Sequence, residues 1–385
     1  MSFNFNNCES IQCEIGASNR LGNLCRQRRF RSVLIITDPG IVQLDLHKGM
    51  LNSFAKTGVN VTLFSDVKAD PSEQVVLDAS LQAQHCQADA VIGFGGGSSM
   101  DVAKLVALLA HPECEQSLAD IYGIEKANGK RLPLIQIPTT SGTGSEVTPV
   151  AIVTTRHMGK MGVVSPLLLP DLALLDAGLT IDLPPAITAA TGIDAMVHAI
   201  EAYTSRIKKN PLSDMYAREA LRLLAGNISQ AVHNGSDINA RENMLLGAML
   251  AGQAFANAPV GAVHALAYPL GSIFHIPHGL SNSLVLTEVM RFNLDAAEQQ
   301  YAELANIIFP DILAGNNSGK ALALIQGLEK LIVDLNLPTR LSDLDITSAA
   351  LRTLASDAMK QQRLLTNNPK EMSEQDAFAI YQAVL

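Results

Sequence analysis

Three of the nine histidines in this sequence lie within fifteen positions, in the stretch VHALAYPLGSIFHIPHGLSN (residues 263–282). Earlier in the chain, the stretch TGIDAMVHAIEAYTS places Asp194 and His198 four positions apart. On a helix, residues at this spacing share one face, one turn apart, so the two side chains can coordinate one metal ion. Such a pair also arises by chance, with a hydrogen bond within the helix as the alternative. The metal hypothesis therefore needs two further ligands.

The histidine-rich stretch can supply those ligands. His264 follows a helical pattern and a short break, whereas His278 lies between Pro277 and Gly279, which we expect to form a rigid turn. One carboxylate with three imidazoles suits Fe(II) or Zn(II). The second half of the chain has no cysteine, which excludes a zinc site rich in thiolates. His275 can contact a ligand or the substrate, or it can be an ordinary packed histidine.

A glycine-rich segment, VIGFGGGSSMDVAKLVALL (residues 91–109), has the pattern of a strand, a turn and a helix. Its consecutive glycines, Gly95 to Gly97, let the backbone approach a bulky anion closely. We expect Ser98 or Ser99 to cap the helix, with Asp101 completing a capping box. The free N–H groups and the positive helix end would then favour a phosphate. The segment matches neither GxGxxG nor a Walker loop, and a tight turn without a ligand is the alternative.

A second polar segment, IPTTSGTGSEVTP (residues 137–149), also follows a predicted strand directly. Its small hydroxyl side chains can bind phosphate or ribose, although a polar surface loop would look similar. Two such loops after neighbouring strands favour a dinucleotide over a mononucleotide. Asp38, at the end of the first predicted strand, can hold a ribose hydroxyl pair. Because its carboxylate would repel a 2'-phosphate, it favours NAD over NADP.

The predicted nucleotide loops and the predicted metal ligands lie in two parts of the chain with different secondary-structure patterns. The first half alternates short apolar runs, predicted as strands at 32–38, 60–66, 88–97 and 133–140, with helical patterns such as 41–55 and 72–86. Such alternation predicts an α/β domain with a doubly wound, Rossmann-like parallel sheet over residues 1–183. Residues 184–385 show only helical patterns, at 186–204, 213–233, 239–256, 295–308, 318–335 and 374–384. They predict an all-helical second domain that opens at Pro184 and Pro185.

Composition narrows the class of protein. The net charge is −9, from 28 basic and 37 acidic residues, which argues against binding to nucleic acid. The N-terminus lacks the pattern of a signal peptide, and no apolar run reaches the ~18 residues of a membrane span. The five cysteines all lie in the first third, without the spacing of a zinc module. We therefore expect a reduced, cytoplasmic enzyme.

Four motifs, in the order of the chain, resemble those of the iron-containing (group III) alcohol dehydrogenases: GGGSSMDVAK, PTTSGTGSEVTP, GIDAMVHAIEAY and HALAYPLGSIFHIPHGLSN. The resemblance runs through LPTRLSDL (337–344) to NNPKEMSEQD near the C-terminus. It implies a dinucleotide-binding α/β domain followed by a helical metal-binding domain, as in dehydroquinate synthase. It also implies Fe(II), sometimes Zn(II), with NAD or NADP, and commonly a homodimer.

The resemblance also implies roles for individual residues. The metal ligands would be Asp194, His198, His264 and His278. The residues that bind the cofactor would be Asp38, Gly95, Gly96, Gly97, Ser98, Asp101, Thr139, Thr140, Thr143 and Lys160.

Two positions depart from the family pattern. Many members carry a further histidine four residues after the first of the two C-terminal ligands, where this sequence has Tyr268. A tyrosine, with an ordinary pKa of about 10, can hydrogen-bond but is a poor proton shuttle at neutral pH. We take Tyr268 and His275 as the candidate catalytic residues, with His275 as a proton relay. The family often has an asparagine in place of Asp70, so that contact with the cofactor is not transferred.

We therefore expect a metal-dependent alcohol dehydrogenase or aldehyde reductase that transfers a hydride between NAD(H) and a small, largely apolar alcohol or carbonyl compound. The metal would act as a Lewis acid on the substrate oxygen. Alternatives are a hydroxyacid or maleylacetate-type reductase of the same family, a lyase of the dehydroquinate-synthase type, and a non-catalytic NAD-binding protein. The lyase would need a cationic pocket, and few Lys or Arg residues lie near the metal motifs.

Overall fold

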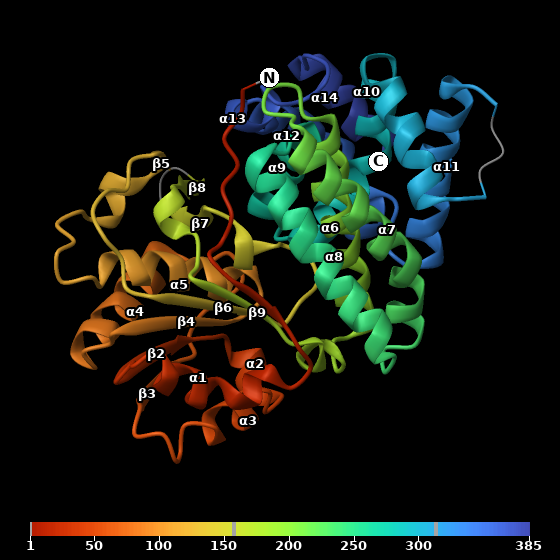
Figure 1. The fold of residues 1–385 in the computed structure, drawn as a ribbon. Helices are drawn as coiled ribbons and strands as arrows, with labels where there is room; N and C mark the ends of the chain where they lie inside the picture. Colours follow the sequence, from red (N-terminus) through yellow and green to blue (C-terminus); the bar gives the residue numbers. More distant parts are fainter. Residues whose placement is uncertain (1, 156–158, 312–314) are drawn as a thin grey trace. The chain divides into compact units, whose positions relative to one another are not determined.

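The computed structural model describes residues 2–155, 159–311 and 315–385, and it divides into two compact units (Figure 1). The sheet unit comprises Asn6–Thr140 and Gly144–Ile181. The helical unit comprises the residues up to Phe5, Ser141–Thr143 and Asp182–Leu385. An α/β part followed by an all-helical part is the predicted fold class, and it is confirmed.

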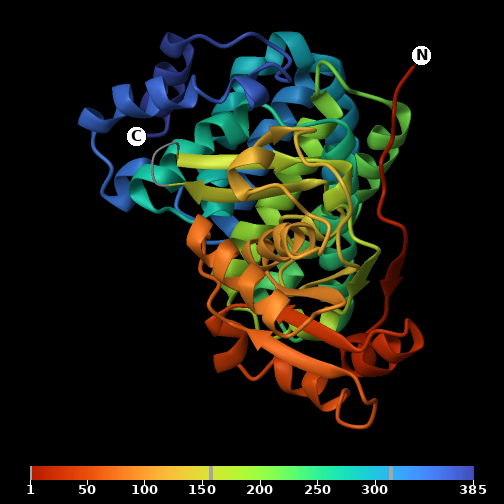
Figure 2. The same ribbon diagram turned by 90° about the vertical axis from the view of Figure 1, so that its left-hand side faces the viewer.

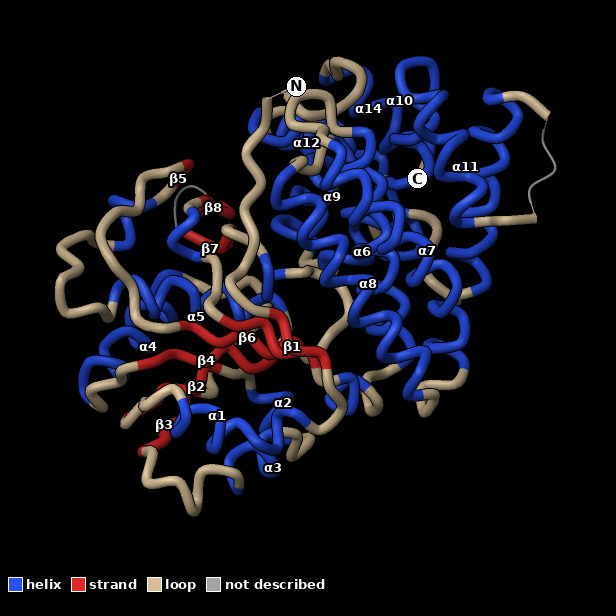
Figure 3. Tube along the Cα trace, viewed as in Figure 1, coloured by secondary structure: helices blue, strands red, loops and turns tan. Residues whose placement is uncertain are grey.

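The sheet unit contains a six-stranded sheet in which every neighbouring pair is parallel (Figure 3). Its order is β1 (Ile11–Cys13), β9 (Leu172–Leu175), β6 (Leu134–Pro138), β4 (Ala90–Gly95), β2 (Ser32–Ile36) and β3 (Asn60–Phe64). The four predicted strands correspond to β2, β3, β4 and β6 and are confirmed. A smaller sheet of β5 (Gly123–Ile124), β8 (Gly159–Val164) and β7 (Val150–Thr155) was not predicted.

Side chains of the strands alternate between two apolar layers. Val33 and Ile35 of β2 belong to one buried cluster, with residues of α1 (Leu21–Gln27) and α3 (His47–Asn52). Leu34 and Ile36 belong to the other cluster, with residues of α4 (Glu73–His85) and α5 (Gly97–Leu109). Helices therefore cover both faces, as expected for a doubly wound sheet whose central strands are buried and largely apolar (Figure 2).

The order of the strands reverses between β2 and β4. From β2 the chain adds β3 on one side, and then returns to place β4, β6 and β9 on the other. At such a switch point, the loops after the two strands diverge and leave room for a ligand at their carboxyl ends. Asp38 follows β2, and Gly95 ends β4 with Gly96 and Gly97 directly after it, so these predicted nucleotide residues lie at this point.

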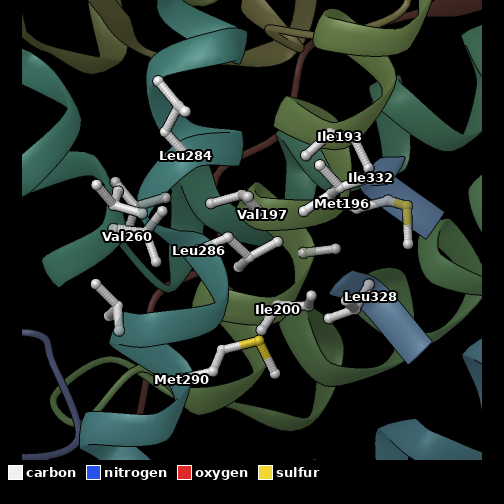
Figure 4. Packing of buried hydrophobic residues seen from close by; sticks show 14 of the residues in the cluster. Ile193, Met196, Val197, Ile200, Val260, Leu284, Leu286, Met290, Leu328 and Ile332 are labelled. Atoms are coloured by element: carbon white, nitrogen blue, oxygen red, sulfur yellow. The ribbon is translucent and has the colours of Figure 1, made fainter. Parts of the chain in front are cut away.

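The helical unit is built around α6 (Pro185–Thr204), which is buried along most of its length. Pro184 is its N-cap and Pro185 its first residue, because a proline needs no N–H partner there. The other helices are α7 (Pro211–His233), α8 (Ile238–Asn257), α9 (Ala262–Phe274), α10 (His278–Ile308), α11 (Asn317–Asp334), α12 (Leu351–Ala358), α13 (Gln362–Leu365) and α14 (Glu374–Ala383). In Figure 4, side chains of α6 pack with Leu286 and Met290 of α10 and Leu328 of α11.

Two predicted helices differ from the structure. The helix predicted at 41–55 is divided into α2 (Pro39–Gln43) and α3, because Asp45 adopts a left-handed conformation (φ 59°). The helix predicted at 295–308 is the second half of the longer α10. The helix α9 was not predicted, because Pro269 lies inside it.

No single helix among those described is long and apolar enough to cross a membrane. The pair formed by α8 and α9, bent by 107° at their break, meets both criteria together.

Candidate metal centre and nucleotide loops

Four side chains of the helical unit converge on one point. Asp194, His198, His264 and His278 each offer a ligand atom, and these atoms all lie within 4.8 Å of one another. The Asp194 Oδ1 atom is 4.0 Å from the Nε2 of His198, 3.8 Å from that of His264 and 3.7 Å from that of His278. Asp194 and His198 share one face of α6, His264 lies in the first turn of α9, and His278 is the first residue of α10.

A glycine allows α10 to begin so close to α6. A Cβ atom on Gly279 would lie 2.3 Å from the carbonyl oxygen of Ala190 and 3.3 Å from the Cβ of Asp194. The prediction that Pro277 and Gly279 flank a turn is wrong, since Pro277 is the N-cap of α10 and Gly279 lies within the helix. The helix axis, rather than a turn, therefore fixes the direction of His278.

Burial and neighbouring charges set the protonation states of Asp194, His198 and His264. Burial lowers the pKa of His198, and it lowers that of His264 well below its ordinary value of 6.5. Burial alone would raise the pKa of Asp194, but the three neighbouring histidines outweigh it and the net direction is downward. The neutral imidazoles of His198 and His264 and the ionised carboxylate of Asp194 are the forms that bind a metal cation.

Asn282, one turn after His278 on α10, completes the inner surface of this cluster. Its Nδ2 donates to Asp194 Oδ1 at 2.6 Å and lies 3.3 Å and 3.4 Å from the Nε2 atoms of His264 and His278. Its Oδ1 is buried and has no hydrogen-bond partner among the described residues. An orphaned oxygen beside one carboxylate and three imidazoles fits a divalent cation, which such donors bind.

Aromatic rings border the cluster. Phe255 stacks on His198 with ring centroids 4.3 Å apart, and the His198 and His264 rings are 4.7 Å apart. The ring of Tyr268 lies 6.0 Å from that of His278, so this residue is next to the ligands. His275 is exposed and is the left-handed C-cap of α9 (φ 57°). It lies outside the group of four ligands, and its role as a relay stays a prediction.

The glycine loop of the sheet unit has the predicted strand–turn–helix form. Gly95 has a φ of 154°, and a Cβ atom there would lie 2.7 Å from Ser99 Oγ and 3.1 Å from Asp38 Oδ2. The predicted cap by Ser98 or Ser99 is wrong, because Gly96 is the N-cap of α5 and no side chain caps it. The first N–H groups of α5 are therefore not used by a capping side chain, which suits an anion.

The predicted capping box with Asp101 is also wrong. The Asp101 carboxylate accepts from Ser145 Oγ at 2.6 Å and from the N–H of Ile152 at 2.9 Å, and so joins α5 to the second loop and β7. Lys104, which is fully buried, donates to Ser145 Oγ at 2.7 Å and to the carbonyl of Val150 at 2.6 Å. A role for Asp101 in cofactor binding stays a prediction.

Other predicted cofactor residues lie around the switch point. Asp38 caps α2, accepting from the N–H of Ile41 at 3.1 Å, and Ser99 Oγ donates to it at 3.4 Å. Thr139, which precedes Thr140, donates its N–H to the carbonyl of Gly95 at 3.0 Å.

For the remaining two predicted cofactor residues, Thr143 and Lys160, a role in cofactor binding stays a prediction. Thr143 is grouped with the helical unit. Lys160 in β8 forms an ion pair with Asp70 at 2.7 Å, so the departure from the family pattern at Asp70 affects the partner of a predicted cofactor residue.

Comparison with known proteins shows which family has this architecture. The family described as iron-containing alcohol dehydrogenase matches residues 8–177, and the Fe-containing alcohol dehydrogenase family, C-terminal, matches residues 188–385. The chain belongs to the iron-containing alcohol dehydrogenase family.

Individual relatives and solved structures align over nearly the whole chain. Long-chain-alcohol dehydrogenase 1 of Geobacillus thermodenitrificans is 39% identical over 96% of this chain and 93% of its own length. The crystal structure of a 1,3-propanediol oxidoreductase superposes with a TM-score of 0.96, 32% identity and 100% coverage of both chains. Sulfoacetaldehyde reductase from Bifidobacterium kashiwanohense, in complex with NAD+, gives a TM-score of 0.88 and 30% identity, covering 100% of this chain and 99% of its own.

This membership makes the protein an oxidoreductase that interconverts alcohols and carbonyl compounds, as predicted. It favours this activity over the lyase and over a protein without catalytic activity.

Proposed function

We propose that this enzyme transfers a hydride between NAD(H) and a small alcohol or aldehyde at an Fe(II) ion held by Asp194, His198, His264 and His278. The observation that carries the proposal is the convergence of these four ligand atoms within 4.8 Å in a member of this family. Zn(II) suits the same donors and is the alternative metal.

The metal, when bound, supplies a Lewis acid for the substrate oxygen. Asp194 provides one negative charge, and the neutral rings of His198 and His264 add none, so the site stays cationic enough to attract an alkoxide. Burial of these three side chains excludes water and strengthens the electrostatic effect on the substrate. Phe255, stacked on His198, gives the site an apolar border that favours a carbon chain.

The loops of the sheet unit support NAD as the hydride carrier. Gly95 to Gly97 and the start of α5 offer backbone N–H groups to the pyrophosphate. Asp38, beside this loop at the switch point, suits a ribose hydroxyl pair and would repel the 2'-phosphate of NADP. Because the ring of Tyr268 lies 6.0 Å from that of His278, we propose that its hydroxyl hydrogen-bonds to the substrate rather than carrying its proton.

We also propose a cytoplasmic homodimer. Cysteine usage supports the location, because buried thiols such as Cys8 and Cys25 are typical of a reducing compartment. The family resemblance supports the dimer, and sedimentation equilibrium would test it.

A carbonyl-reduction assay tests the central proposal. Protein purified without oxygen is stripped with a chelator, and loss of NADH is followed with small aldehydes, hydroxy acids and ketones after adding Fe(II) or Zn(II). We expect Fe(II) to restore the reduction of small aldehydes, with NADH preferred to NADPH. Reduction that is unaffected by the chelator would contradict the proposed site.

A further inference from the structure

Glu201 contacts the helix that carries His264 with both oxygens of its carboxylate. It lies on α6, three residues after His198, and is only 7% exposed. Its Oε1 accepts the N–H of Val263 at 2.7 Å, and its Oε2 lies 2.7 Å from His264 Nδ1. Gly261, the N-cap of α9, has no capping side chain of its own, so the carboxylate also satisfies the first turn of this helix.

The contact with His264 decides which ring nitrogen carries the proton. A neutral imidazole has one N–H. In its ionised form the Glu201 carboxylate can only accept, so Oε2 holds that proton on the adjacent Nδ1. The Nε2 atom is then left with its lone pair, 3.8 Å from Asp194 Oδ1 and 3.3 Å from Asn282 Nδ2. Without Glu201, the proton would be free to move to Nε2, which faces the proposed metal.

We propose that Glu201 is a positioning residue that keeps His264 in the Nδ1–H form, with Nε2 ready to bind the metal. This inference rests on the proposed metal site, but its central claim concerns the ring of His264 in the metal-free protein. A purely structural role, anchoring the start of α9 through Val263, would leave the tautomer unaffected.

The variant Glu201→Gln separates these roles. It preserves the size of the side chain and one acceptor for Val263, but its amide N–H₂ cannot accept the His264 proton. Glu303→Gln is the matched control, since Glu303 in the same unit accepts from the Tyr203 hydroxyl at 2.5 Å and is not among the contacts of the ligands.

The first measurement is the ¹⁵N NMR spectrum of the histidine rings in the full-length, chelator-treated protein, with His264 assigned by its absence in His264→Gln. We expect the Nδ1–H form in the wild type and in Glu303→Gln, and the Nε2–H form in Glu201→Gln. An Nε2–H ring in the wild type overturns the inference, even if Glu201→Gln fails to fold.

The second measurement is the affinity for Co(II), followed by its visible absorption in competition with a chelator. We expect a loss of about tenfold to a hundredfold in Glu201→Gln, as for other partners of metal-bound histidines, and none in Glu303→Gln. An unchanged Co(II) affinity in Glu201→Gln overturns the inference. So does a lost Co(II) affinity if the His264 ring of this variant keeps the Nδ1–H form. If the wild type has the Nδ1–H ring but binds no Co(II), Fe(II) or Zn(II), the proposed function fails instead.

Discussion

Asp194 is the one carboxylate among the four proposed ligands, and all three histidine Nε2 atoms face its Oδ1. In Asp194→Asn the side chain keeps its size but loses its charge, and the neutral amide is a weaker ligand for a divalent ion. We expect the bound iron and the reduction of aldehydes to fall together by about a hundredfold or more, because losing even an outer partner of a metal ligand costs about tenfold to a hundredfold. Metal analysis and the NADH assay check this, with the half-exposed Asp334→Asn as control. Retained iron with lost activity would contradict it.

Glu146 is a buried carboxyl group in the sheet unit, where it is only 1% exposed. Burial raises its pKa from 4.5 to about 7, although Lys104 opposes the change. Between these two values the folded protein holds a proton that the unfolded chain releases. The free energy of unfolding therefore falls as pH rises through this window, by about 3 kcal/mol in total.

Replacing Glu146 with glutamine removes this titration. We expect the free energy of unfolding of Glu146→Gln, relative to wild type, to increase from pH 5 to pH 8. Urea unfolding of the chelator-treated proteins measures it, with the exposed Glu115→Gln as control. Parallel pH profiles for Glu146→Gln and wild type would show that Glu146 does not titrate in this range.

At the scale of elements, the contact between α6 and α10 depends on Gly279. In Gly279→Ala, the new methyl group would meet the Ala190 carbonyl, so the start of α10 must move away from α6. We expect a loss of about 1–3 kcal/mol in the free energy of unfolding and weaker metal binding, because His278 moves with the helix.

Gly226→Ala is the matched control for this change. Gly226 lies within α7, and apart from the backbone of its own helix no atom of the described residues lies within 4 Å of the position where its Cβ would be. Because alanine favours a helix more than glycine does, we expect this variant to gain up to about 1 kcal/mol without a change in metal affinity. Equal effects of the two substitutions would show that Gly279 is not a packing contact.

The sequence predicts those elements whose pattern of apolar residues can be recognised within the element itself, without knowledge of what packs against it. The strands β2, β3, β4 and β6 are mostly apolar runs, and sequence alone identifies them. The antiparallel strands β7 and β8 contain two threonines, a lysine and two glycines, so they resemble a loop until their pairing is known. The helix α9 contains a proline, and only packing shows that it continues through that residue.

The same distinction applies to the site. Asp194 and His198 have a helical spacing that points to a metal, whereas Glu201 looks like an ordinary helix residue until α9 packs beside it. Asn282 follows His278 by one turn, a spacing that could have indicated it. The Asp101 capping box was a reasonable local interpretation, but Ser145 and Ile152, distant in sequence, bind the carboxylate instead.

For the whole molecule, the two ligand types should stabilise different units. All four proposed metal ligands belong to the helical unit, whereas the glycine loop belongs to the sheet unit. At a metal concentration a thousandfold above Kd, binding adds about 4 kcal/mol to the free energy of any unfolding step that disrupts the site. We expect metal to slow hydrogen exchange in α6, α9 and α10, and NAD to slow it around β4 and α5.

Hydrogen-exchange mass spectrometry with each ligand alone tests this division. A chelator should reverse the effect of the metal, and AMP should reproduce part of the effect of NAD. Protection by metal that is strongest in the sheet unit would place the metal elsewhere in the chain.

The uneven exposure of the four ligands has a kinetic consequence. The side chains of Asp194, His198 and His264 are 2%, 5% and 3% exposed, whereas that of His278 is 34% exposed. An ion can therefore enter or escape past His278, the first residue of α10, without the core helices separating. The lifetime of the bound ion would then be set by how often one helix end frays, so exchange with free metal can be fast in a site whose equilibrium affinity is high.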